Sequence, residues 1–232
     1  MGIGRVEDPL SSPAPPITIA PERSTVDKIT FSGLIEAVQP RIRLTRSFDQ
    51  SSHTYQGFVL RISGEVGGSQ GSVVVALGEA AQAKHGFRAG DRVAGEGEPV
   101  EDDRKEIADL YKIAKLKRFP GAGNEVGEPP WLALPPALEV YRSRGHRRLD
   151  PKTFKAKCVT CMWACEMAVE MIIDHWNPSQ VQWRRETFCY GPKSCKLYRA
   201  GPTRKVPGRK GMTWEEEDWV DEQQTSHRGD DE

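Results

Sequence analysis

Residues 28–38 read KITFSGLIEAV, and this short stretch indicates the kind of fold that the chain adopts. Its β-branched and aromatic residues are typical of a strand, and Gly33 interrupts it near the middle. A glycine inside a strand often marks a bulge or a sharp bend. We therefore expect a long first strand that bends at Gly33, as the strands of a small barrel must.

Four further runs downstream have the same β-rich character and are separated by turn residues. An Ala-rich stretch between the second and third of them, GEAAQAKHGF, is long enough for two helical turns and is closed by Gly86. The predicted order is therefore three strands, a short helix and two strands. The four strand runs are HTYQGFVLRISGEV (53–66), QGSVVVAL (70–77), AGDRVAGEGEPV (89–100) and DLYKIAKLKRF (109–119).

This order, together with the phrase GDRVAGEG, resembles an OB-fold, a five-stranded barrel with a helix between its third and fourth strands. The resemblance implies a ligand face on the second and third strands, which accepts single-stranded nucleic acid or oligosaccharide. We predict the α+β class, with an OB-like β-barrel followed by a smaller, mainly helical and loop-rich Cys-ligated metal module. The expected divisions are a disordered arm (1–27), the barrel (28–119), a Pro-rich packed connector (120–150), the Cys-rich metal-binding module (151–213) and an acidic tail (214–232).

Charge is distributed unevenly, although the whole chain has 33 basic and 33 acidic residues. Between Tyr141 and Gly211 there are 16 Lys or Arg residues and 5 Asp or Glu residues. The last 20 residues, TWEEEDWVDEQQTSHRGDDE, hold nine acids and one arginine. A basic module followed by an acidic tail suggests a polyanion partner, with a tail that competes for the same surface. Ordinary solvated charged faces are the alternative interpretation.

Cations interleaved with aromatic residues favour nucleic acid as the partner. Arg41 and Arg43 alternate with apolar residues, so on a strand they point to one side. Phe48, Tyr55 and Phe58 follow, and they would either stack on bases or lie in the core. The candidate nucleic-acid-binding residues are Arg41, Arg43, Lys115 and Lys117 in the barrel and Arg147, Arg148, Arg204 and Arg209 beside the metal module.

Three of the five cysteines lie in KCVTCMWACEMAVEMIIDHW, residues 157–176. On a helix these three would share one face, and a helix N-terminus would favour their thiolate forms. They could instead be small core residues, but two more cysteines downstream favour a metal site. A [4Fe-4S] cluster fits three grouped thiolates with one distant partner, and zinc is the alternative. The candidate ligands are Cys158, Cys161, Cys165, Cys189 and Cys195, with either Cys189 or Cys195 as the fourth.

The predicted function is that of a cytoplasmic nucleic-acid-binding protein, for single-stranded or structured DNA or RNA, with a structural Fe-S or zinc site. One alternative is an iron-sulfur redox protein or enzyme, in which Glu166 and Glu170 could act as acid or base. Another is a module that binds a protein or an acyl group. No catalytic motif, signal peptide or membrane span is recognisable, so no catalytic residues and no membrane partner are predicted.

Overall fold

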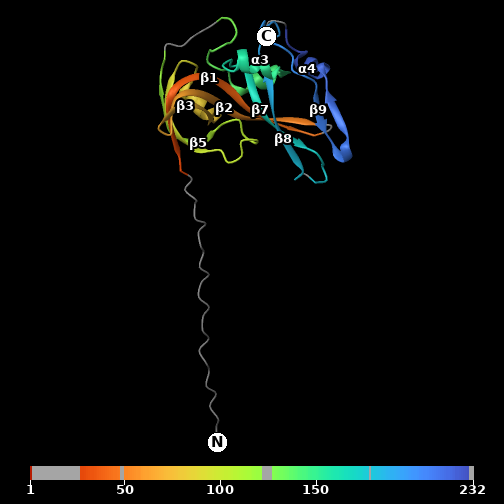
Figure 1. Cartoon of the computed structure of the whole chain (residues 1–232), viewed down its shortest axis with the longest axis horizontal. Coiled ribbons are helices and arrows are strands. Elements are labelled where there is room, and N and C mark those ends of the chain that lie inside the picture. The colour runs from red at the N-terminus through yellow and green to blue at the C-terminus, as the bar shows by residue number, and fades with distance from the viewer. Residues whose placement is uncertain (2–26, 48–49, 122–126, 178, 230–232) are drawn as a thin grey trace.

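A computed structural model describes residues 1, 27–47, 50–121, 127–177 and 179–229, and shows a mostly β architecture (Figure 1). Eight strands form one mixed sheet in the order β2-β3-β5-β4-β1-β7-β8-β6. Two further strands, β9 and β10, form a separate hairpin. The predicted disordered arm, apart from its first and last residues, and Phe48 lie outside the described residues.

The first five strands and the helix between them follow the order expected from the sequence, up to Phe119. Strand β2 joins β1 to β3, β3 continues to β5, and β5 continues to β4. Strand β4 then pairs with β1, so that the pairings close into a ring. The elements are β1 (Ile29–Arg46), β2 (Ser51–Val66), β3 (Ser69–Leu77), α1 (Glu79–His85), β4 (Arg92–Pro99) and β5 (Leu110–Phe119).

Strand β1 belongs to both halves of the sheet. Its residues 29–34 pair with β4, whereas residues 43–46 run parallel to β7. Gly33 lies where β1 presses against β2, since a Cβ atom there would be 2.3 Å from the backbone oxygen of Ser63. Glycine is therefore required at this close approach between two strands.

The predicted fold class is wrong, because the chain forms one large mixed sheet rather than a separate five-stranded barrel followed by a metal module. The second half of the chain is not mainly helical. Strand β7 pairs with β1 and with β8, so this half extends the same eight-stranded sheet. The short helical turns lie at its edges. The elements are α2 (Leu138–Arg144), β6 (Arg147–Arg148), α3 (Pro151–Thr153), the π-helical turn η1 (Phe154–Cys158), β7 (Ala164–Ile172), β8 (Val181–Cys189), β9 (Arg204–Pro207), the 3-10 turn η2 (Arg209–Gly211), β10 (Thr213–Glu216) and α4 (Asp218–Thr225).

The helix expected through the cysteine segment stops at Cys158, and Cys165 lies on strand β7 instead. The sequence ACEMAVEMI of β7 is buried on one face and partly buried on the other. A short apolar run of this kind fits a buried strand as well as a buried helix. Because β7 pairs with β1 on one side and β8 on the other, its backbone N–H and C=O groups find hydrogen-bond partners there, and the segment is a strand rather than a helix.

One hydrophobic core serves both halves of the sheet. Ile42 and Leu44 of β1 pack in the same cluster as Met167 and Val169 of β7 and Phe188 of β8. Within the described part of the chain, no helix has the length and apolar character needed to cross a bilayer.

Candidate nucleic-acid interface

Three cysteines meet in a small core at one end of β7 and β8. Cys158 ends η1, Cys161 lies in the following turn, and Cys189 ends β8. They pack together in one cluster against the partly buried side chains of Trp131 and Leu197. The cluster therefore fastens η1 to the loop that follows β8.

Burial keeps these thiols protonated near neutral pH. It raises the pKa of Cys158 to about 11 and that of Cys161 to about 12, and the nearby Cys189 adds to both shifts. The pKa of Cys165, in the main core, is also raised by burial. Burial also raises the pKa of Cys189, although the charge of Arg147 and the Gly191 amide, which donates to Cys189 Sγ over 3.4 Å, act in the opposite direction.

The metal module predicted as part of the fold is not present in the arrangement of the described residues. In that part of the chain no three His, Cys, Asp or Glu side chains are placed so that they could hold a metal ion. All five cysteines are free, and Cys195 lies in the loop after β8 rather than in the cluster. Thiols are suitable donors for zinc and for iron-sulfur clusters, so the [4Fe-4S] or zinc ligands remain a prediction.

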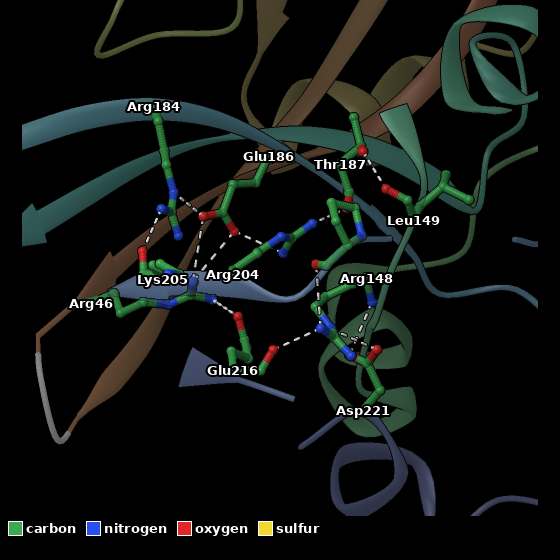
Figure 2. A network of polar contacts seen from close by, with 11 residues as sticks. Arg46, Arg148, Leu149, Arg184, Glu186, Thr187, Arg204, Lys205, Glu216 and Asp221 are labelled. Carbon is green, nitrogen blue, oxygen red and sulfur yellow. Dashed lines mark hydrogen bonds and ion pairs between the residues drawn. The ribbon is translucent and has the colours of Figure 1, made fainter. Parts of the chain in front are cut away.

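A buried network of arginines and carboxylates joins the acidic C-terminal segment to the sheet (Figure 2). Arg46 of β1 is 3% exposed, and its guanidinium lies 3.4 Å from Glu186 of β8 and 2.9 Å from Glu216 of β10. Arg204 of β9 approaches the same Glu186 carboxylate at 2.7 Å. The guanidinium groups of Arg46 and Arg204 therefore share Glu186, which ties β1, β8 and β9 together (Figure 2).

Arg148 forms the second half of this network. Its side chain is fully buried, and its Nε donates to Asp221 of α4 over 3.0 Å. Its Nη1 donates to the backbone oxygen of Glu216 over 2.7 Å, and its Nη2 pairs with Asp218. The acidic segment that contains Glu216 and Asp221 is thus attached to the basic half of the chain by buried ion pairs.

These contacts decide where the predicted nucleic-acid residues of the second half lie. Arg148 and Arg204 are buried and paired with carboxylates. Arg147 is also buried; it donates to the Pro192 oxygen over 2.9 Å and lies 3.9 Å above the Tyr198 ring. Only the fourth candidate, Arg209, is exposed, with Asp174 at 3.5 Å.

The four candidate nucleic-acid-binding residues of the first half are more accessible, but three of them already bind protein groups. Arg41 forms a two-pronged pair with Glu106, and Arg43 donates to the Lys105 oxygen over 3.2 Å. Lys115 is exposed but pairs with a carboxylate of β4, whereas Lys117 is exposed on β5.

A different set of cations is exposed over the cysteine cluster, and we call it the lysine face. Its members are Lys152, Lys155, Lys157, Lys196 and Arg199. The Asp150 amide donates to the Arg199 oxygen over 3.0 Å, which holds α3 and the loop after β8 side by side. Among the residues that the structure places, none of the five comes within ion-pair distance of a carboxylate. The sequence signal was present in the basic run RRLDPKTFKAK, but the arginines in it are the buried ones.

A cavity of about 320 Å³ lies beside the lysine face. Trp131, Pro129 and Leu197 supply apolar walls, Lys196 and Cys195 line it from the loop after β8, and Glu128 adds one carboxylate. This volume is at the lower end of those that hold small ligands, and the lining combines an aromatic ring with a cation. Such a pocket can receive a planar group attached to an anion.

Comparison of the chain with models of protein families, with curated proteins and with solved structures found no match. The candidate interface therefore rests on the geometry of this chain alone.

Proposed function

We propose that the protein binds nucleic acid, in single-stranded or locally unpaired form, through the lysine face. The observation that carries this proposal is the set of five exposed cations on two adjoining segments, none of them paired with a described carboxylate, beside a tryptophan-lined cavity. Elsewhere in the basic half, Arg148 and Arg204 are paired with carboxylates and are therefore not available to bind phosphate.

The chemistry of the lysine face suits a phosphate backbone. Exposed lysines gain affinity by releasing the counterions that surround a polyanion, and they need no fixed geometry to do so. The cavity next to Lys196 suits a base that has left its stack, because Trp131 offers an aromatic surface and Leu197 an apolar wall. Binding of this kind is tolerant of sequence and sensitive to salt.

The cysteine cluster has a supporting role in this proposal. By packing Cys158 and Cys161 of one segment against Cys189 and Leu197 of the other, it holds the two cationic segments together. A cytoplasmic location belongs to the same proposal, since five free cysteines are expected in a reducing compartment.

The test is binding of fluorescently labelled single-stranded DNA and RNA, followed by anisotropy at several salt concentrations. We expect affinity to fall steeply between about 50 and 200 mM salt. The double variant Lys152→Gln/Lys155→Gln should weaken binding at least tenfold and lower the salt slope by about 2, one for each lost phosphate contact.

The matched control is Lys112→Gln/Lys115→Gln, which removes the same charge from two exposed lysines that already pair with Glu98 and Glu96. This control should change affinity less than twofold. Equal losses in both double variants would show a general charge effect, and would reject the lysine face as the binding surface.

A further inference from the structure

The loop between β4 and β5 crosses the outer face of the sheet, and we call its residues 101–109, EDDRKEIAD, the acidic strap. It holds five carboxylates and two basic residues. Its ends are fixed by backbone bonds, since Asp109 donates to Val74 over 2.7 Å and Val100 donates to Asp109 over 2.9 Å. Ala108 is buried on Val59 and Ala76.

Between these ends the strap is held by arginine side chains. Arg41 pairs with the Glu106 carboxylate, and Arg43 donates to the Lys105 oxygen. Arg185 of β8 donates to the backbone oxygens of Asp103 and Glu106. Burial opposes ionisation of Glu106, but the bond and charge of Arg41 hold its pKa below its ordinary value. The strap therefore presents a carboxylate and carbonyl oxygens to three guanidinium groups.

We call these three arginines, together with Trp183 of β8, the arginine strip. Arg43 lies over the Trp183 ring, 5.7 Å from its centroid. The indole Nε1 of Trp183 is buried and has no hydrogen-bond partner among the described residues. A cavity of about 240 Å³ lies beside these contacts and is lined by residues of both parts, Asp103 of the strap and Trp183 and Arg185 of the strip among them.

Two polar residues, Gln39 and Arg61, lie between the arginine strip and the lysine face. Gln39 of β1 donates to the Cys161 oxygen over 3.0 Å and accepts from Arg61 of β2 over 3.0 Å. A shallow cavity of about 130 Å³ lies between Arg61 and the turn at Val159 and Thr160, which directly follows the lysines of η1. Arg61 is the cation on this route across β2, and the carboxylates of Glu166, Asp109 and Glu36 act on it.

We propose that the arginine strip is a second nucleic-acid-binding surface, and that the acidic strap occupies it until a long single strand displaces the strap. This inference rests on the proposed function and adds its regulation. Phosphate oxygens can replace the oxygens that the strap offers to Arg41, Arg43 and Arg185, while a base takes the cavity beside Trp183. Short strands occupy the lysine face alone and leave the strap in place.

The experiment compares strands of about 6 and about 18 nucleotides, since known single-strand sites span roughly 4–16 nucleotides. The variant Asp103→Asn/Glu106→Gln removes two negative charges from the strap, and one of them is the carboxylate that pairs with Arg41. It should raise affinity for the long strand about tenfold with less than twofold change for the short one. The matched control, Glu96→Gln/Glu98→Gln, removes two carboxylates from β4 that pair with exposed lysines, and should leave the ratio of the two affinities unchanged.

Hydrogen exchange on the unaltered protein gives a second reading that does not depend on the variant folding. Amides 102–107 should exchange faster when the long strand is bound and should not change with the short strand. If the long strand binds through the lysine face without either effect, the strap inference is overturned and the proposed function stands. If neither strand binds the unaltered protein or the strap variant, the proposed function itself fails.

Discussion

Mild acid should destabilise the fold because it contains two neighbouring histidines, of which His146 is buried and His53 is partly buried. His53 of β2 and His146, which precedes β6, have ring centroids 4.7 Å apart, and His146 also meets the edge of Phe188 at 4.8 Å. Burial, with the nearby charge of Arg46, lowers the pKa of His53 from 6.5 to about 4. Burial also holds the pKa of His146 well below its ordinary value, and His53, Arg46 and Arg204 add to the effect.

The direction of the change in stability follows from the pH at which the folded and the unfolded state each bind protons. The unfolded chain protonates both histidines below about pH 6.5, whereas the folded chain keeps them neutral down to about pH 4 for His53. The free energy of unfolding is therefore unaffected by these histidines above pH 6.5, where both states hold them neutral, and it decreases as the pH falls from 6.5 toward 4. For His53 alone the loss by pH 4.5 should be roughly 2–3 kcal/mol, since one pKa unit corresponds to about 1.4 kcal/mol.

The assay is urea unfolding at pH 7.5, 6.5, 5.5 and 4.5, comparing the unaltered protein with His53→Phe. His53 Nε2 has no hydrogen-bond partner among the described residues, so replacing the imidazole by a phenyl ring breaks no hydrogen bond of that atom. The variant should lose less stability between pH 6.5 and 4.5, and His85→Gln, outside the pair, serves as the control. Equal acid sensitivity in His53→Phe and the unaltered protein would refute this account of the pair.

Two further predictions concern the buried network and the cysteines. Replacing Arg148 by Met should lower the free energy of unfolding by about 3–5 kcal/mol, because the buried Asp221 carboxylate then loses its guanidinium partner and keeps only the backbone amide of residue 148. Arg209→Ala should cost less than about 1 kcal/mol. Similar losses for both variants in urea unfolding would show that burial does not strengthen the Arg148 ion pair. Protein purified without oxygen should contain iron with brown colour, or zinc, in stoichiometric amount if the cysteines bind metal. Metal-free protein with full stability would remove that prediction.

The first half of the chain could be anticipated because its signals are local. Gly33 marks the close approach of β1 to β2, and Gly86, with a left-handed φ of 59°, ends α1 as expected. Strand runs separated by turn residues leave few alternatives to the order of elements up to Phe119. The identity of the partner strand is not a local property, so the sheet of eight strands could not be foreseen.

The candidate interface was anticipated only in part. The basic run before the cysteines was recognised, but its arginines are buried and its lysines are exposed. Arginine can satisfy several acceptors at once in a buried pair, as Arg148 does, and a lysine on a short exposed turn cannot. The acceptors that made the difference, Glu186, Glu216 and Asp221, come from distant parts of the chain.

The sequence by itself determined the β-rich first half, the clustered cysteines and the separation of basic from acidic segments, because composition and short-range spacing are enough to specify these. Only the tertiary structure decided which charges neutralise one another, that β7 is a strand, and that the acidic strap lies on Arg41 and Arg43. The physical reason is that burial and ion pairing depend on which surfaces meet, and contacts such as Arg41–Glu106 and Arg148–Asp221 join residues more than 50 positions apart.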